Sequence, residues 1–164
     1  DPIAGTIGFI ATQATYLDKA GVIGAARAMI MDEIAWAIRF GGESAGKDQP
    51  VTLVATDTHP GNYMVDASGK AILVDVEKML YGSPAIDLAH ATLYTSTTWD
   101  VDCGIALKPN DIQGFYRDYL ARIDASLARR LKPWLAPMRR LAWLRTTTWA
   151  ARFKADHGYE PFEN

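Results

Sequence analysis

The sequence predicts an α+β fold in which helices dominate and a small β-hairpin carries the polar loops. Several segments repeat apolar side chains at the spacing of an amphipathic helix. One central stretch, residues 51–74, instead places short runs of β-branched residues between turn-forming Asp, Ser and Gly. With 164 residues and 49% apolar composition the chain is large enough for a packed core, so we expect residues 1–164 to form a single domain.

The N-terminal part is predicted to be helical, and its strongest signal covers residues 25–40. The apolar face of that helix comprises Ile30, Ile34 and Ile38. Gly41-Gly42 is expected to end it, because glycine adopts the left-handed conformation of a helix C-terminus at little cost. Two glycines weaken the helix prediction over residues 3–20. Residues 24–50 would then form a helix and loop that lead into the central stretch.

The central stretch is predicted to be one strand followed by a β-hairpin. The strands span residues 51–55, 63–65 and 71–74. A polar loop at 56–62 separates the first two, and a turn at 66–70, rich in Asp, Ser and Gly, joins the last two.

Oxygen-bearing side chains are expected to meet at the open end of this hairpin. Antiparallel pairing about the turn places Asn62 and Asp75 at facing positions, which lie about 4.5–5.5 Å apart in such a ladder. Asp57 lies five residues upstream on the adjoining loop. Three oxygen donors suit a hard cation such as Mg²⁺ better than a structural zinc.

The C-terminal half is predicted to contain three helices and one long loop. The helices span residues 84–94, 111–132 and 138–154, and the loop spans residues 95–110. Ser83 followed by Pro84 is typical of an N-cap with proline at the first helical position. Asn110 or Asp111 is expected to cap the second helix. Pro133 is expected to separate the last two, because proline removes a hydrogen bond from a helix interior.

Charge is distributed unevenly along the chain, although the net charge is only −2. Residues 31–111 contain twelve acidic and five basic side chains, whereas residues 112–154 contain ten basic and two acidic ones. These basic side chains are scattered around amphipathic helices, which indicates a solvated surface rather than a nucleic-acid site. Binding of nucleic acid through residues 112–154 is the weaker alternative.

The bulk composition predicts a protein that has no membrane partner. No apolar run approaches the length of a membrane span. The single cysteine, Cys103, excludes an internal disulfide and fits a reducing compartment. We therefore expect a cytoplasmic location.

The central stretch also carries the residue types that phosphoryl transfer requires. Asp57 is followed by Asn62 and, beyond the hairpin, by Asp75. In kinases an Asp accepts the proton of the substrate hydroxyl, an Asn holds one Mg²⁺, and a later Asp holds Mg²⁺ against the nucleotide phosphates. These types suit the reaction because it depends on positioning and charge neutralisation more than on covalent catalysis.

Residues 51–91 resemble the aminoglycoside phosphotransferase and choline kinase-like family of small-molecule kinases. The similarity rests on ATDTHPGNYMV and ILVDVEKMLYGSPAIDLAH, beside a family signature close to H-G-D-x-H-P-G-N, a strand ending in Asp, and G-x-P-x-x-D-L-A. The resemblance implies the C-terminal lobe of a protein-kinase-like fold. Residues 51–91 would be its catalytic and metal-binding core, and residues 92–164 a helical subdomain on the substrate side.

The resemblance further implies a Mg²⁺-dependent enzyme that transfers the γ-phosphoryl group of ATP to a small-molecule hydroxyl. The acceptor would be an aminoglycoside, choline or another amino alcohol, or a sugar-like compound. Asp57 is then the catalytic base, and Asn62 and Asp75 are the Mg²⁺ ligands. Glu77 forms an Asp-x-Glu pair with Asp75 and is expected near a second metal, since the two side chains share one side of a strand. Asp87 would brace the catalytic loop.

Simpler interpretations stand beside these roles. Asp57 and Asn62 could be ordinary turn residues, and Glu77 could be a surface carboxylate without a function. His59 is expected to stabilise its turn, because no Cys or second His lies at the spacing of a zinc site.

Four residues are candidates for binding the acceptor: Trp99, Asp100, Asp102 and Trp149. A Trp beside carboxylates could hold a cationic substrate through cation–π and charge contacts. Alternatively, Trp99 covers the core as part of a loop, and Trp149 packs inside the last helix.

Two departures from the family pattern define the alternatives. Ala55 and Thr56 stand where the family has His and Gly before the catalytic Asp. The Gly-rich loop and strand lysine of the family's ATP-binding lobe are not found, so we expect that lobe upstream of Asp1 and an inactive isolated C-terminal lobe. The alternative to an enzyme is a pseudokinase-like module that binds a nucleotide or a partner without catalysis.

Overall fold

The computed structural model describes residues 2–100, 102 and 104–158 of the chain. The chain divides into two compact units, residues 1–47 with 144–164 and residues 48–143. The long helix α6 (Ala125–His157) contributes to both. The single domain expected from the chain length stays a prediction beside this division. Cys103, from which the reducing compartment was inferred, lies outside the described residues.

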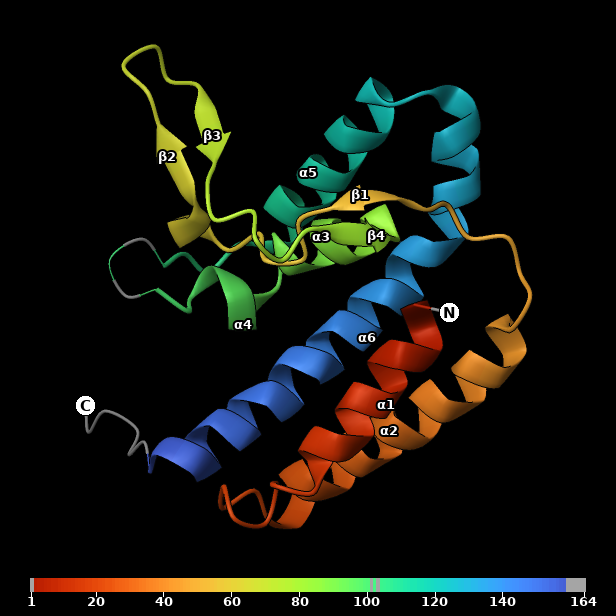
Figure 1. Ribbon diagram of the computed structural model, residues 1–164, viewed down its shortest axis with the longest axis vertical. Helices are drawn as coiled ribbons and strands as arrows, with labels where there is room; N and C mark the ends of the chain where they lie inside the picture. Colours follow the sequence, from red (N-terminus) through yellow and green to blue (C-terminus); the bar gives the residue numbers. More distant parts are fainter. Residues whose placement is uncertain (1, 101, 103, 159–164) are drawn as a thin grey trace. The chain divides into compact units, whose positions relative to one another are not determined.

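The first unit consists of α1 (Pro2–Ala14), α2 (Gly24–Ser44) and the C-terminal part of α6 (Figure 1). The prediction that Gly41-Gly42 ends the second helix is wrong, because α2 continues to Ser44. A Cβ atom on Gly41 would lie 2.5 Å from Cδ1 of Ile7, so this glycine lets α1 approach closely. The left-handed residue comes only at Gly46, where φ is 74°.

The core of the first unit is largely apolar and contains a buried polar contact. Its fully buried side chains include Ile10, Leu17 and Leu144. Among them the hydroxyl of Thr148 donates to the side-chain oxygen of Gln13 at 2.9 Å. The hydrogen bond ties α1 to α6 within this unit and satisfies groups that would be costly to bury alone.

The second unit contains two small antiparallel sheets. The antiparallel hairpin of β2 (Tyr63–Val65) and β3 (Ala71–Leu73) confirms that these two strands pair. The predicted register is wrong by one residue: Tyr63 faces Leu73, so Asn62 lies opposite Val74 rather than Asp75. β1 (Thr52–Val54) pairs instead with β4 (Leu80–Gly82), with Leu53 opposite Tyr81. The strand at residues 80–82 was not among those predicted from the sequence. Figure 1 shows the β2–β3 hairpin extending away from the β1–β4 pair.

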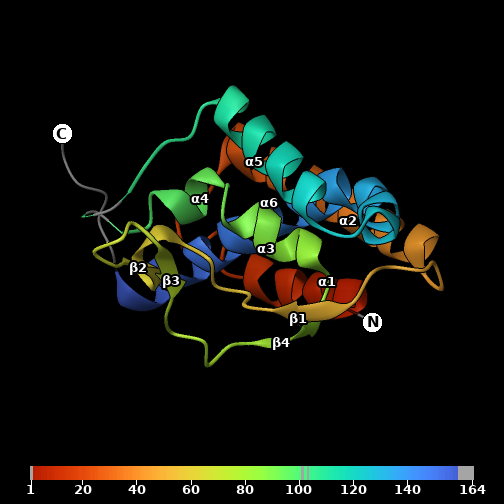
Figure 2. The same ribbon diagram turned by 90° about the horizontal axis from the view of Figure 1, so that it is seen from above.

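The helices of the second unit are α3 (Pro84–His90), α4 (Tyr94–Thr97), α5 (Pro109–Arg122) and the N-terminal part of α6. α3 packs along β1 (Figure 2). It begins at the predicted Ser83 cap, where the Ser83 hydroxyl accepts the N–H of Ala85. It ends at His90 rather than at residue 94, and α4 lies at the start of the predicted long loop.

The expected break at Pro133 is wrong, because α6 runs through Pro133 and Pro137. The break comes earlier, where one carboxylate oxygen of Asp124 accepts the N–H groups of Ser126 and Leu127 and starts α6. Buried side chains flank the prolines, including Leu131, Trp134 and Met138. Tertiary packing therefore holds a helix where local propensity would end it.

The N-terminus of α5 also differs from the prediction, because Lys108 is the cap rather than Asn110 or Asp111. The carboxylate of Asp111 reaches back to accept the N–H of Lys108 at 3.0 Å. Asp111 thus supplies the acidic half of a capping box three residues inside the helix.

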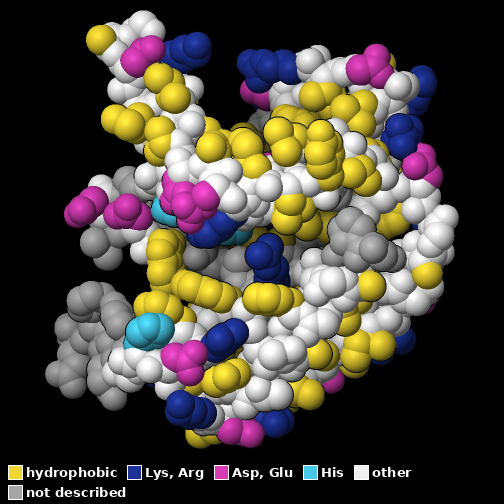
Figure 3. Space-filling view, in the orientation of Figure 1, with side chains coloured by type: hydrophobic (Ala, Val, Ile, Leu, Met, Phe, Trp, Pro, Cys, Tyr) yellow, Lys and Arg dark blue, Asp and Glu magenta, His cyan; other side chains and the backbone are white. Residues whose placement is uncertain are grey.

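The strands of the second unit expose large apolar side chains (Figure 3). They include Leu53, Met64, Val65, Leu80 and Tyr81. No helix within the described residues is long and apolar enough to cross a membrane.

Candidate functional site

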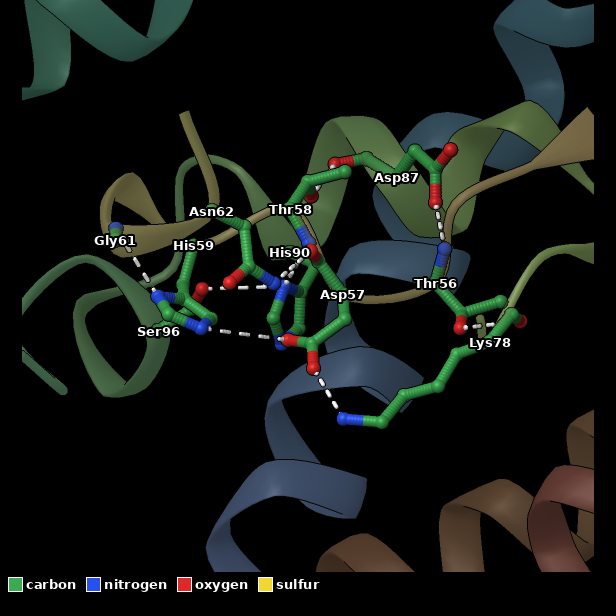
Figure 4. Close-up of polar contacts among 10 residues, drawn as sticks. All are labelled: Thr56, Asp57, Thr58, His59, Gly61, Asn62, Lys78, Asp87, His90 and Ser96. Atoms are coloured by element: carbon green, nitrogen blue, oxygen red, sulfur yellow. Dashed lines mark hydrogen bonds and ion pairs between the residues drawn. The ribbon is translucent and has the colours of Figure 1, made fainter. Parts of the chain in front are cut away.

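The 55–62 loop, between β1 and β2, is held by hydrogen bonds to the carboxylate of Asp87 in α3. The two oxygens of Asp87 accept the N–H groups of Ala55 and Thr56, each at 2.8 Å. Figure 4 shows the contact with Thr56. Burial raises the pKa of Asp87, and the two backbone N–H donors oppose that rise. Asp87 therefore braces the backbone immediately before Asp57, the position assigned to it from the sequence.

His90 provides a second brace that sequence reasoning missed. Its Nδ1 accepts the N–H of Thr58 at 3.1 Å and lies 3.2 Å from the hydroxyl of Ser96. The Thr58 hydroxyl donates to the backbone carbonyl of Asp87 at 3.1 Å. Asp87 and His90 are three residues apart and share one face of α3. That i, i+3 spacing is the signal that could have identified His90.

The Asp57 carboxylate lies at the centre of the loop and is largely shielded, with 20% of its side chain exposed. Its Oδ2 is 2.6 Å from Nζ of Lys78, and its Oδ1 is 3.9 Å from Nε2 of His59 (Figure 4). Burial raises the pKa of Asp57, but the hydrogen bond and charge of Lys78 and the charges of two histidines outweigh it. The net effect lowers the pKa, so the carboxylate is ionised at neutral pH.

His59 contacts its own turn, as expected for a turn-stabilising residue. Its Nδ1 accepts the N–H of Gly61 at 3.1 Å. A Cβ atom on Gly61 would lie 2.9 Å from Cε1 of His59 and 2.6 Å from Oδ2 of Asp100. A side chain at position 61 would therefore clash with both His59 and Asp100, and glycine permits this close approach.

Asn62 is buried and fixed at both its side chain and its backbone. Its side-chain N–H₂ donates to the backbone carbonyl of Asp57 at 2.9 Å. Its backbone carbonyl accepts the N–H of Val74 at 2.8 Å. The hairpin therefore brings Asn62 next to the end of β3, one residue before Asp75. Asp75 adopts a left-handed φ of 57°, which is uncommon for a residue other than glycine.

Lys78 is the second site residue that sequence reasoning missed. It directly follows the Asp75-x-Glu77 pair, and that position was the available signal. Its hydrogen bond with Asp57, and the charges of Asp57, Asp75 and Glu77, raise its pKa against the opposing effect of burial. The ammonium therefore lies in the field of three carboxylates that the sequence assigned to catalysis and metal binding.

The oxygen donors at the hairpin end fit Mg²⁺ held jointly with a nucleotide. Within the described residues, no group of three or more His, Cys, Asp and Glu side chains could hold a metal by itself. The side-chain amide oxygen of Asn62 and the carboxylate of Asp75 would supply two oxygen ligands. Mg²⁺ is commonly bound by one or two carboxylates together with waters and substrate phosphates. The expectation that Asp75 and Glu77 share one side of a strand is wrong, because β3 ends at Leu73, Asp75 has a left-handed φ and Glu77 lies in a turn. The metal roles of Asn62, Asp75 and Glu77 stay predictions.

Among the candidate acceptor-binding residues, Asp100 lies close to the 55–62 loop at Gly61. Its Oδ1 accepts the N–H of Asp102 at 2.9 Å, and the neighbouring Trp99 is 47% exposed. Trp149 belongs to the first unit, where its ring stacks on Phe153 at 5.3 Å. The substrate roles of these residues stay predictions.

Comparison with known proteins agrees with the chemistry that these side chains allow. The profile of the APH phosphotransferase enzyme family matches residues 13–134, well over half of the chain. The chain is therefore an enzyme of the phosphotransferase kind. It belongs to the APH phosphotransferase enzyme family, which confirms the resemblance inferred from residues 51–91. Searches of curated proteins and of solved structures gave no significant match.

Proposed function

We propose that the protein transfers the γ-phosphoryl group of ATP to the hydroxyl of a small molecule. The observation that carries this proposal is the link between Asp57 and Asn62, whose side-chain amide is hydrogen-bonded to the Asp57 carbonyl at 2.9 Å. A candidate base and a candidate metal ligand are thereby fixed relative to one another. Phosphoryl transfer depends on such positioning.

In the proposed reaction the acceptor hydroxyl donates a hydrogen bond to the Asp57 carboxylate. The hydroxyl oxygen forms a bond to the γ-phosphorus while the bond to the β–γ bridging oxygen breaks, and ADP leaves. The hydroxyl proton passes to Asp57. The lowered pKa of Asp57 keeps it ready to accept a hydrogen bond at neutral pH. Mg²⁺, held by Asn62 and Asp75, would neutralise charge on the phosphates.

The acceptor class is proposed from the residues beside the loop. Asp100 and Asp102 carry negative charge next to the exposed ring of Trp99. Carboxylates and an aromatic face favour an acceptor that carries an ammonium group, such as an aminoglycoside or an amino alcohol. A sugar-like acceptor would depend on hydrogen bonds to the same carboxylates.

A second candidate is a binding module without catalysis. Ala55 replaces the family histidine, and the candidate base is paired with Lys78 at 2.6 Å. A carboxylate that is permanently paired in this way would not accept a substrate proton. Stabilisation by MgATP without consumption of ATP for any hydroxyl acceptor would favour this candidate.

The two candidates are separated by the Asp57→Asn variant of the full-length protein. We expect turnover with a panel of aminoglycoside, amino-alcohol and sugar acceptors to fall about 10²- to 10⁴-fold, the usual contribution of general base catalysis. Thermal stabilisation by MgATP should be retained. Glu43→Gln, an exposed carboxylate change on α2, is the matched control. Full turnover in Asp57→Asn would refute the base assignment.

A further inference from the structure

We propose that Lys78 binds the phosphoryl group during its transfer, donating from its ammonium to an oxygen of the γ-phosphate. This inference rests on the proposed function, because it assigns a residue to that same reaction. It extends the site by a cation that belongs to the protein itself.

The position of the ammonium supports this role. Nζ of Lys78 is 2.6 Å from Oδ2 of Asp57, the candidate base (Figure 4). Lys78 also follows Asp75 by three residues in the same exposed segment. In the proposed reaction Asp57 marks the acceptor side and Asp75 marks the phosphate side. The ammonium of Lys78 reaches Asp57 from the segment that begins at Asp75, which suits a cation that serves the phosphoryl group during its transfer.

The backbone of Lys78 is tied to the 55–62 loop, while its side chain is accessible. The hydroxyl of Thr56 donates to the carbonyl of Lys78 at 3.1 Å, and Thr56 itself has a left-handed φ of 64°. The Lys78 side chain is 55% exposed. The backbone of Lys78 is thus held next to the loop, while its exposed side chain can reorient toward a ligand.

A purely stabilising ion pair explains this arrangement less well. Ion pairs with substantial exposure contribute little to folding. A fixed cation aimed at charge that develops during the reaction contributes much more. An ammonium has three N–H donors, and the Asp57 contact uses one of them. When the acceptor hydroxyl takes its place at Asp57, the ammonium can turn a donor to a phosphoryl oxygen while it stays protonated.

Nucleotide binding tests the proposal without any acceptor. The affinities of the full-length protein for ADP and for β,γ-imido-ATP are measured by calorimetry in the presence of Mg²⁺. In Lys78→Met we expect affinity for β,γ-imido-ATP to fall roughly tenfold with little change for ADP, because one charged hydrogen bond to the γ-phosphate is lost. Lys78→Arg should retain most of the affinity.

Controls distinguish failure of this proposal from failure of the proposed function. Lys70→Met removes a lysine from the β2–β3 turn and should leave both affinities unchanged. If wild-type protein prefers β,γ-imido-ATP over ADP and Lys78→Met keeps that preference, the Lys78 proposal is wrong. The same holds if Lys78→Met only tightens Mg²⁺ binding, which would make Lys78 a counterion. If wild-type protein binds neither nucleotide, the proposed function fails and this inference falls with it.

Discussion

The two segments that carry the candidate site are held in different ways. The 55–62 loop is buried or half-buried except at Gly61, whereas residues 75–79, the 75–79 segment, are exposed throughout. Asp87 and His90 of α3 accept hydrogen bonds from backbone N–H groups of the loop. The 75–79 segment has no such support from a helix: its described hydrogen bonds join the N–H of Met79 to Val76, the carbonyl of Lys78 to Thr56, and the ammonium of Lys78 to Asp57.

Both segments nevertheless contain a residue other than glycine in the left-handed region, Thr56 in the loop and Asp75 at the start of the exposed segment. Such conformations persist where the surroundings determine them strongly, and they are concentrated at functional sites. For the 55–62 loop, α3 provides those surroundings through Asp87 and His90. In the 75–79 segment they would be completed by the bound metal and nucleotide. If the proposed function holds, Asp57 is positioned before the substrates bind, whereas the 75–79 segment adjusts when the metal and nucleotide bind.

The largest expected effect on stability comes from removing the brace under the loop. Asp87→Ala leaves the N–H groups of Ala55 and Thr56 without their acceptor in a buried environment. We expect the free energy of unfolding to fall by about 2–3 kcal/mol, measured by denaturant titration. Turnover should fall with it, because Asp57 loses its fixed backbone.

Asp66→Ala is the matched control for that variant. Asp66 also accepts two backbone N–H groups, those of Ser68 and Lys70, but in the exposed turn of the β2–β3 hairpin. Water can replace the carboxylate there, so we expect a cost of less than about 1 kcal/mol. Equal costs for the two variants would show that burial of the loop does not set its rigidity.

A smaller effect is expected from the second brace. His90→Ala removes the acceptor of the Thr58 N–H and should lower the free energy of unfolding by about 1 kcal/mol. Because the loop would shift, we expect turnover to fall while the KM for ATP changes little. His90→Asn places an amide oxygen near the position of Nδ1 and should recover most of both losses. Equal defects in the Ala and Asn variants would argue against a positioning role.

Local sequence signals were sufficient for the parts of the site that depend on neighbouring residues. The hairpin followed from its β-branched runs and its Asp-Ala-Ser-Gly turn, and pairing of its strands brought Asn62 next to the end of β3. The Ser83 cap was predicted for the same reason, since capping is decided within one turn of helix.

Contacts between distant segments were not predictable in this way. The pairing of β1 with β4 and the contact of Lys78 with Asp57 join residues more than twenty positions apart. α2 passes through Gly41-Gly42 because α1 packs against it, and α6 passes through two prolines with buried neighbours. In these two helices tertiary packing outweighed the local preference against a helix, about 1 kcal/mol for each glycine and about 3 kcal/mol for each proline.

The smallest expected effect concerns the pH dependence of the Asp57–Lys78 pair. A lowered pKa in the folded state means that folding favours the ionised carboxylate. The contribution is therefore complete above the unfolded-state pKa of an aspartate, about 3.9, and is lost as pH falls through the lower folded-state value. Because Lys78 is 55% exposed, we expect at most about 1 kcal/mol.

The measurement compares the free energy of unfolding of wild-type protein and Asp57→Asn between about pH 7 and pH 3. Both proteins contain Asp87, whose pKa is raised and whose opposite effect on stability therefore cancels in the difference. The stability advantage of wild-type protein over Asp57→Asn should shrink at the acid end. When both proteins also carry Lys78→Met, the same difference should shrink at a higher pH, because the cation that lowers the pKa of Asp57 is gone. A difference that stays constant with pH would mean that Lys78 does not lower the pKa of Asp57. The electrostatic link between Lys78 of the exposed segment and Asp57 of the loop would then be refuted. The hydrogen bonds from the loop to α3 would be unaffected.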